Sequence, residues 1–235
     1  MDHILEDLAW LGLGFDDEIV YQSERFPIYA EALDHLKSEG LVYPCFCTRS
    51  QIAAEVAASA SAPHGPEGLI YPGTCRGLDP AERDRRRSAE AHAWRLDMAK
   101  ALRQSGRLYW NNEGRQILAE PELFGDVVLA RKDAPVSYHL AVTVDDGAQG
   151  VTDVVRGADL FASTHVHRLL QHLLGLAAPD YHHHKLLAGA DGQRLAKRNG
   201  APTLASLREQ GVDPQKLVAD LLEGRLPSGY SADAP

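Results

Sequence analysis

The order of apolar patterns along the chain predicts an α/β fold, a sheet flanked by helices, with an inserted α+β segment. Three observations predict it. A helix–strand–helix pattern spans the first 40 residues, short strand-like segments fill residues 92–156, and helical periodicity returns after residue 157. Apolar residues make up 44 % of the 235 and charged residues 24 %, a balance that supplies a core and excludes general disorder.

The N-terminal elements follow from helical spacing and capping residues. Apolar side chains at positions 4, 5, 8 and 11 predict a first helix, which Gly12 ends. A short apolar run at residues 19–21 predicts a strand. Ser23 is expected to cap a second helix, with Gly40 after its end.

Residues 41–80 change character. The segment from Thr48 to Gln51 fits a capping box for an alanine-rich helix. Residues 60–77 hold three prolines and four glycines, which predicts a loop. Asp79 and Pro80 then have the spacing of the cap and first position of another helix, which carries four arginines between residues 83 and 87.

The second half of the chain alternates strands and helices. We expect strands at 92–98, 107–110, 116–118, 127–131 and 140–144, with a turn at 145–147 and a further strand closing at Arg156. An apolar stripe ending at Gly175 predicts a helix, and two more helices are expected after Thr203 and from Asp213 to Glu223.

Composition limits the classes of function. The net charge of −9 argues against indiscriminate coating of nucleic acid, so a nucleic-acid partner would meet a local basic patch. No apolar run approaches the roughly 20 residues of a membrane span, and the first residues lack the pattern of a signal peptide. Three cysteines cannot close a disulfide framework. We therefore expect a cytoplasmic protein without a membrane partner.

The cysteines form a candidate metal site. Cys45 and Cys47 are one residue apart, and Cys75 lies in the Gly/Pro-rich loop. Soft thiolates at this spacing suit a tetrahedral structural zinc, whose fourth ligand would be His64, Tyr71 or water. Three unrelated buried cysteines are an equally good interpretation of the spacing alone.

Two further segments are candidates for binding anions. Residues 189–200 form a glycine-bounded cationic loop in which Arg194, Lys197 and Arg198 would grip a polyphosphate, although a solvated basic loop is the commoner outcome. Arg156 is expected at the carboxyl end of a strand, where an arginine suits a carboxylate, and Tyr138 lies one strand earlier. A surface ion pair of Arg156 with Asp153 or Asp159 is the alternative.

Two conspicuous runs are given structural interpretations. The histidines at 182–184 are expected in a polar loop, because consecutive residues cannot easily point at one ion. The arginines at 83–87 are expected to form a solvated helix face rather than a nucleic-acid patch.

Taken in order, these motifs resemble one enzyme family over nearly the whole chain, from Asp7 to about Glu223. The segments are YPCFCTR at 43–49, YPGTCR at 71–76, GDVVL at 125–129, YHLAVTVDD at 138–146, VVRGADL at 154–160 and DGQRLAKRNGA at 191–201. Their combination resembles the glutamyl-queuosine tRNA(Asp) synthetases, which are shortened class I relatives of glutamyl-tRNA synthetase. Members join glutamate to queuosine in the anticodon of tRNA(Asp), using ATP with Mg²⁺.

The resemblance implies a role for each candidate residue. It makes Cys45, Cys47, Tyr71 and Cys75 the zinc ligands, which favours Tyr71 over His64. It assigns Tyr138 and Arg156 to glutamate. It assigns Lys197, with Arg194, to ATP and makes Lys197 the catalytic lysine of a KMSKS-type loop. In that loop Arg194 and Ala196 depart from the usual lysine and serine. The helix after Ser163 reads Thr164-His165-Val166-His167, where relatives usually carry a proline and then Arg-Gln.

The resemblance also implies a division of the chain. Residues 1–43 and 133–185 would be the two halves of a Rossmann-type core, 44–132 an inserted zinc-binding, acceptor-type subdomain, and 186–235 the KMSKS-type loop with C-terminal helices. No HIGH-type signature is present, so the first β-α unit is expected to be missing and the chain to be inactive alone. Only 37 residues follow Arg198, which argues against the alternative of a glutamyl-tRNA synthetase fragment. A catalytically dead, zinc-containing RNA-binding paralogue is the other alternative.

Overall fold

The structure is a computed structural model that describes residues 2–58, 64–189, 195, 203–226 and 231. The chain divides into two compact units, one of Tyr21–His183 and the other of Met1–Val20 with His184–Pro235. Each is described by itself below. No helix in the described part of the chain is long and apolar enough to cross a membrane.

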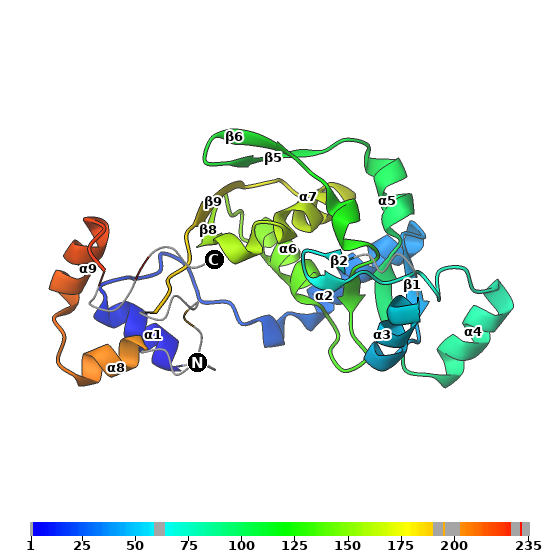
Figure 1. The fold of residues 1–235 in the computed structure, drawn as a ribbon, viewed down its shortest axis with the longest axis horizontal. Helices are drawn as coiled ribbons and strands as arrows, with labels where there is room; N and C mark the ends of the chain where they lie inside the picture. The colour runs from blue at the N-terminus through cyan, green and yellow to red at the C-terminus, as the bar shows by residue number, and fades with distance from the viewer. Residues whose placement is uncertain (1, 59–63, 190–194, 196–202, 227–230, 232–235) are drawn as a thin grey trace. The chain divides into compact units, whose positions relative to one another are not determined.

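The larger unit alternates helices and strands along its sequence (Figure 1). Its first half comprises η1 (Gln22–Glu24), α2 (Phe26–Ser38), β1 (Val42–Cys45), α3 (Arg49–Ala58), β2 (His64–Gly65), β3 (Gly68–Leu69), α4 (Pro80–Ala89), β4 (Ala93–Leu96) and α5 (Met98–Ser105). Its second half comprises β5 (Tyr109–Asn112), β6 (Arg115–Leu118), η2 (Pro121–Phe124), β7 (Val128–Ala130), α6 (Tyr138–Ala148), β8 (Asp153–Gly157), η3 (Ala158–Leu160), α7 (Ser163–Leu173) and β9 (Asp180–His184).

These strands form three sheets. A three-stranded antiparallel sheet has the order β1-β4-β7, and β2 with β3 forms a small hairpin. The four-stranded sheet has the order β6-β5-β9-β8. Within it β5 pairs antiparallel with β6 and parallel with β9, where Asn112 lies opposite Tyr181. The α/β character predicted from the sequence is therefore confirmed.

One hydrophobic core joins the helices to the three-stranded sheet. Helices α6 and α7 lie side by side, and α5 packs on α7 (Figure 1). The core contains fully buried leucines from α2, β4, β7, α6 and α7: Leu36, Leu96, Leu129, Leu140, Leu169 and Leu170. A second, smaller cluster contains Tyr43, Cys45, Phe46, Tyr71 and Cys75.

The prediction of a strand at 140–144 followed by a turn is wrong, because these residues lie inside α6. Ser137 caps this helix, and Thr143 and Val144 are buried together with Leu140. The helix is buried on more than one side, so its apolar residues form the continuous run that also characterises a buried strand. Tertiary burial thus overrides the strand preference of the valines and threonine.

Asp145, which was expected in that turn, anchors α6 to α2. Its buried carboxylate accepts hydrogen bonds from Gln22, from Arg25 at 2.8 Å and from the Tyr29 hydroxyl at 2.7 Å. Burial and the hydrogen bond to Asp145 raise the pKa of Tyr29 to about 12. The phenol therefore stays protonated and donates to the carboxylate.

Other boundaries also differ from expectation. Residues 19–21 form no strand, and the second helix begins at Phe26 after Arg25 rather than after Ser23, which lies in η1. The histidines at 182–184 belong to β9 and not to a loop. Alternation along this strand sends His182 to Asp153 and His183 to Asn112.

Most predicted caps are confirmed. Thr48 and Gln51 exchange hydrogen bonds as a capping box before α3. Asp79 accepts from the backbone N–H groups of α4 with Pro80 at its first position. In the smaller unit Thr203 caps α8 (Leu204–Glu209), and Asp213 caps α9 (Pro214–Leu222).

The smaller unit contains the first predicted helix, α1 (Asp2–Trp10). Arg208 of α8 forms ion pairs with two residues of α1, Glu6 at 3.0 Å and Asp7 at 2.9 Å. An isolated bridge pairs Ala188 with Ser231. Arg194, Lys197 and Arg198 lie outside the described residues.

Candidate metal centre and candidate active site

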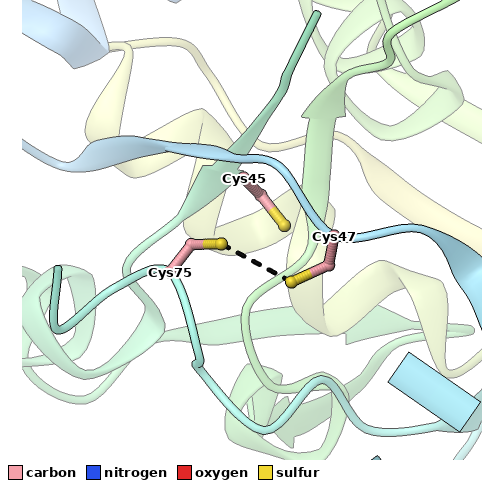
Figure 2. Close-up of side chains that lie close together, drawn as sticks. All are labelled: Cys45, Cys47 and Cys75. Atoms are coloured by element: carbon pink, nitrogen blue, oxygen red, sulfur yellow. Dashed lines mark hydrogen bonds between the residues drawn. The ribbon is translucent and has the colours of Figure 1, made fainter. Parts of the chain in front are cut away.

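The three cysteines come together in the larger unit from three points of the chain. Cys45 ends β1, Cys47 precedes α3, and Cys75 lies in the loop before α4. Their Sγ atoms all lie within 4.8 Å of one another, and those of Cys47 and Cys75 are 3.5 Å apart. Figure 2 shows the three thiols pointing toward a common centre. This is the sole such group of His, Cys, Asp and Glu side chains in the described part of the chain.

Tyr71 is the fourth polar side chain at this cluster. Its hydroxyl oxygen lies 3.5 Å from the Cys47 Sγ and accepts a hydrogen bond of 2.8 Å from the Cys75 backbone N–H. The guanidinium of Arg95 stacks 4.0 Å above the Tyr71 ring. His64 is exposed on β2 and does not join the cluster. The structure thus brings Tyr71 to the thiols and leaves His64 outside.

The donor set fits a tetrahedral zinc ion. Sulfurs bound to zinc at about 2.3 Å lie about 3.8 Å apart, close to the spacing of the Sγ atoms here. Burial raises the pKa of the Cys47 thiol to about 11. Burial also raises the pKa of Tyr71, together with its hydrogen bonds to the cysteines. For Cys75 burial acts in the same direction, but hydrogen bonds from Tyr71 and the Phe46 N–H outweigh it and lower the pKa.

Arg156 is the next-to-last residue of β8 and donates to four neutral acceptors. Its Nε donates to His183 Nε2 at 3.2 Å, and its Nη1 donates to His167 Nδ1 at 3.3 Å. Its Nη2 donates to Thr164 Oγ1 at 2.6 Å and to the Leu160 carbonyl at 3.2 Å. The side chain is therefore fixed without using its charge.

The alternative interpretation of Arg156, a surface ion pair with Asp153 or Asp159, is not seen among the described residues. Among the described residues no carboxylate lies within ion-pair distance of Arg156, and Asp153 pairs with His182 instead, at 3.1 Å. Burial raises the pKa of the nearby Asp146, and the charge of Arg156 opposes that rise. An arginine held in this way can bind an anion from outside, because its charge has not been neutralised.

Tyr138 and Arg156 both contact the ring of His167. Tyr138 is the first residue of α6 and is 49 % exposed. Its ring centroid is 5.7 Å from that of His167, the same ring that accepts from Arg156. Tyr138 and Arg156 therefore both contact His167, and their shared role at one site stays a prediction.

Sequence reasoning missed the polar groups behind these two residues. His139 and His167 are 9 % and 2 % exposed, and their rings share a hydrogen bond of 3.1 Å. Glu67 contacts His139 from the loop between β2 and β3. The available signal was a histidine within each of two amphipathic helical segments, which is compatible with ordinary packing as well.

A cavity of about 510 Å³ lies between the cysteine cluster and α6. Charged and polar side chains on its wall include Arg49, Glu67, Arg95, Asp126, Arg131 and His139, and Tyr71 lines it as well. Asp126 is buried and accepts from Arg76, Tyr43 and the Met98 N–H, so it ties the cysteine loop to the sheet. The wall therefore carries three arginines, Arg49, Arg95 and Arg131, and two carboxylates, Glu67 and Asp126.

The fold and the site define a class. Residues 1–227 match the family described as tRNA synthetases class I (E and Q), catalytic domain, and the chain belongs to that family. The structure is similar to the glutamate-tRNA synthetase of Elizabethkingia anophelis, with a TM-score of 0.68 at 24 % identity. That match covers 85 % of this chain and 42 % of the other, and at this identity it supports the fold alone.

Within the class, the chain is similar to glutamyl-Q tRNA(Asp) synthetases. It is 44 % identical to that of Rhodobacter capsulatus over 90 % of this chain and 77 % of the relative. It is 42 % identical to that of Symbiobacterium thermophilum over 94 % of this chain and 69 % of the relative. It is 44 % identical to that of Deinococcus radiodurans over 92 % of this chain and 68 % of the relative. The resemblance stated from the motifs is confirmed.

Proposed function

We propose that the chain takes part in activating glutamate with ATP and in transferring it to queuosine in the anticodon of tRNA(Asp); that it is inactive alone stays a prediction. The observation that carries the proposal is the state of Arg156, a guanidinium fixed by neutral acceptors with no described carboxylate beside it. Four of its five N–H groups are used, so one N–H on Nη1 and the full charge are available to a carboxylate. The half-exposed Tyr138 supplies a hydroxyl near it.

The proposed reaction has two balanced steps. A carboxylate oxygen of glutamate attacks the α-phosphorus of ATP, and pyrophosphate leaves, giving glutamyl-adenylate. A queuosine hydroxyl then attacks the activated carbonyl, and AMP leaves. Such chemistry depends on alignment and on stabilising charge at the phosphate rather than on covalent catalysis.

In this scheme Arg156 and Tyr138 hold the amino acid. Lys197, helped by Arg194, stabilises the phosphate charge as pyrophosphate departs, the role expected of a KMSKS-type loop. Mg²⁺ accompanies ATP as part of the substrate, and no residue of this chain is assigned to it.

For the cysteine cluster we propose a structural zinc held by Cys45, Cys47, Tyr71 and Cys75. The convergence of the Sγ atoms and the Tyr71 hydroxyl supports these four over a set that includes His64. When bound, zinc would cross-link the segments at residues 45–47 and 71–75. The division at 1–43, 44–132, 133–185 and 186–235 and the cytoplasmic location stay predictions.

Three tRNAs test the proposed substrate. Arg49, Arg95 and Arg131 on the cavity wall support an RNA partner. We expect the chain to bind tRNA(Asp) that carries queuosine more tightly than tRNA(Asp) without it, and both more tightly than tRNA(Glu), in filter-binding assays at one fixed salt concentration. Preference for tRNA(Glu) would favour a glutamyl-tRNA synthetase instead. Equal binding of all three, without glutamate binding, would favour an RNA-binding paralogue.

A further inference from the structure

A line of four side chains connects Arg156 to Glu67 through two buried histidines. Arg156 Nη1 lies 3.3 Å from His167 Nδ1, and His167 Nε2 lies 3.1 Å from His139 Nδ1. His139 Nε2 lies 3.5 Å from Glu67 Oε2. The four come from β8, α7, α6 and the turn between β2 and β3, so folding of the larger unit assembles the line.

The chemistry of the two ends fixes the direction of every hydrogen bond. Arginine has only donors, so His167 Nδ1 must accept and the His167 proton must lie on Nε2. That N–H donates to His139 Nδ1, which places the His139 proton on Nε2. The last N–H points at the Glu67 carboxylate, which can only accept. One pair of tautomers therefore satisfies the whole line, and both rings are neutral in it.

The glutamate end of the line is held in place independently. Ser163 at the start of α7 donates to Glu67 Oε1 at 3.0 Å. Gly65 lies so close to the Leu123 carbonyl oxygen that any Cβ there would collide with it, so glycine is what lets this turn approach η2. Hydrogen bonding to His139 lowers the pKa of Glu67 despite its partial burial.

No other described ionic group on the surrounding elements competes for the two rings. Around His167 are Arg156 from β8, with Tyr138 and His139 from α6. Around His139 are Glu67 and the ring of Phe124 from η2. Beyond Arg156 lie His183 and Tyr181 of β9 and Asp146 of α6. Burial, His139 and the charge of Arg156 all lower the pKa of His167.

We propose that His167 and His139 are positioning residues for Arg156, acting as a one-way hydrogen-bond chain from Arg156 to Glu67. This rests on the proposed function, in which Arg156 binds the glutamate carboxylate. These hydrogen bonds fix the plane of the Arg156 guanidinium and leave its remaining Nη1–H for the substrate.

The arrangement makes Arg156 sensitive to protons. A proton added to His167 turns its Nδ1 from acceptor into donor, facing Arg156. A proton added to His139 makes His167 accept at Nε2 and move its own proton to Nδ1, with the same result. Arg156 then loses an acceptor, so glutamate affinity is expected to fall on acidification. The added positive charge alone would instead strengthen binding of an anion, so the two effects have opposite signs.

The first experiment reads the tautomers directly and does not depend on glutamate. In ¹⁵N-histidine-labelled full chain, long-range ¹H–¹⁵N spectra at about pH 7.5 should assign the proton to Nε2 in both rings, using His139→Gln and His167→Gln for assignment. A proton on Nδ1 of His167, or a charged His167 at that pH, would contradict the proposed hydrogen-bond chain even if Arg156 binds glutamate.

The second experiment separates positioning from packing by calorimetric titration with glutamate between about pH 7.5 and about pH 5.5. His167→Phe keeps a ring but offers no acceptor, and we expect affinity to drop about tenfold or more across the whole range. His167→Gln, whose oxygen accepts from Arg156 and whose NH₂ donates to His139, should restore affinity to within a few-fold and flatten its pH dependence.

Circular dichroism of each variant checks that it is folded. Wild-type affinity that rises on acidification, or a His167→Gln profile with the wild-type slope, would overturn the proposal. If Arg156→Ala binds glutamate as well as wild type, the proposed function of Arg156 fails, while the tautomer spectra still decide whether the chain exists.

Discussion

The cysteine cluster and the Arg156 site lie in the same compact unit, and they arrange charge in opposite ways. At the cluster three thiols and a phenol converge, and all four would give up their protons as ligands of the proposed zinc. At the other site a permanent cation is surrounded by neutral acceptors. The first composition suits a cation and the second an anion, so each site indicates the sign of its ligand.

The largest expected effect concerns the cysteine cluster and its proposed zinc. Purified wild type should contain one zinc per chain by metal analysis, and Cys75→Ser should lose it and lower the midpoint of thermal unfolding by about 10 °C. The reason is that one ligand is lost from a set that closes two distant segments. His64→Ala is the matched control and should keep its zinc. Wild-type protein with no zinc and freely titratable thiols would contradict the assignment.

The second effect concerns the open site. Arg156→Lys keeps the positive charge but replaces a planar fork, which uses three nitrogens, by a single ammonium. We expect glutamate affinity about tenfold lower than wild type, measured by calorimetry, because one ammonium cannot satisfy His183, His167 and Thr164 at once. Wild-type affinity in this variant would show that charge alone, and not its fixed orientation, makes the site.

The third effect is a pH dependence of stability. Burial lowers the pKa of His167 below its ordinary value, so the unfolded chain binds a proton at higher pH than the folded chain does. Stability is therefore fully present above about pH 6.5 and is lost as the pH falls below it, by up to about 1.4 kcal/mol per pH unit. Urea unfolding at a series of pH values checks this, and His167→Gln should remove that part of the slope. An identical slope in the variant would place the proton uptake elsewhere.

The smallest effect is a control on the exposed face of α4, at side chains that form only surface ion pairs. Arg85 and Arg87 of α4 pair with Glu82 and Asp84 of the same helix, as expected of a solvated face. Arg85→Ala should leave glutamate affinity, zinc content and the unfolding midpoint unchanged within error, because exposed ion pairs contribute little. A loss of tRNA binding in this variant would instead make α4 part of the nucleic-acid surface.

What the sequence could predict of this fold was mostly local. The predicted caps at Thr48 and Asp79 and the predicted helices after Thr203 and from Asp213 depend on neighbours within a few residues, and each is confirmed. The segment at 140–144 failed because its burial on several sides depends on the packing of α2 and α7. A continuous apolar run cannot distinguish a buried helix from a buried strand.

Site residues could likewise be predicted where local spacing marks them, but not where only the folded structure brings them together. Close spacing marked Cys45 and Cys47, and the ends of elements marked Arg156, but no pattern in the sequence joins Glu67 to His139 or His139 to His167. Those contacts span 72 and 28 residues and exist only once the larger unit is folded. The sequence predicts a polar loop for the histidines at 182–184. In the structure they lie in a strand, and its alternation brings only His183 within hydrogen-bond distance of Arg156.

We propose that Arg156 is a fixed cation, with no described carboxylate within ion-pair distance, and that it recognises the carboxylate of glutamate. Calorimetric titration of the full chain with glutamate and with glutamine at neutral pH tests it most directly, using Arg156→Ala and the surface control Arg85→Ala. The account predicts that wild type and Arg85→Ala bind glutamate at least about tenfold more tightly than glutamine, and that Arg156→Ala loses this preference. Equal preference for glutamate in wild type and Arg156→Ala would contradict it.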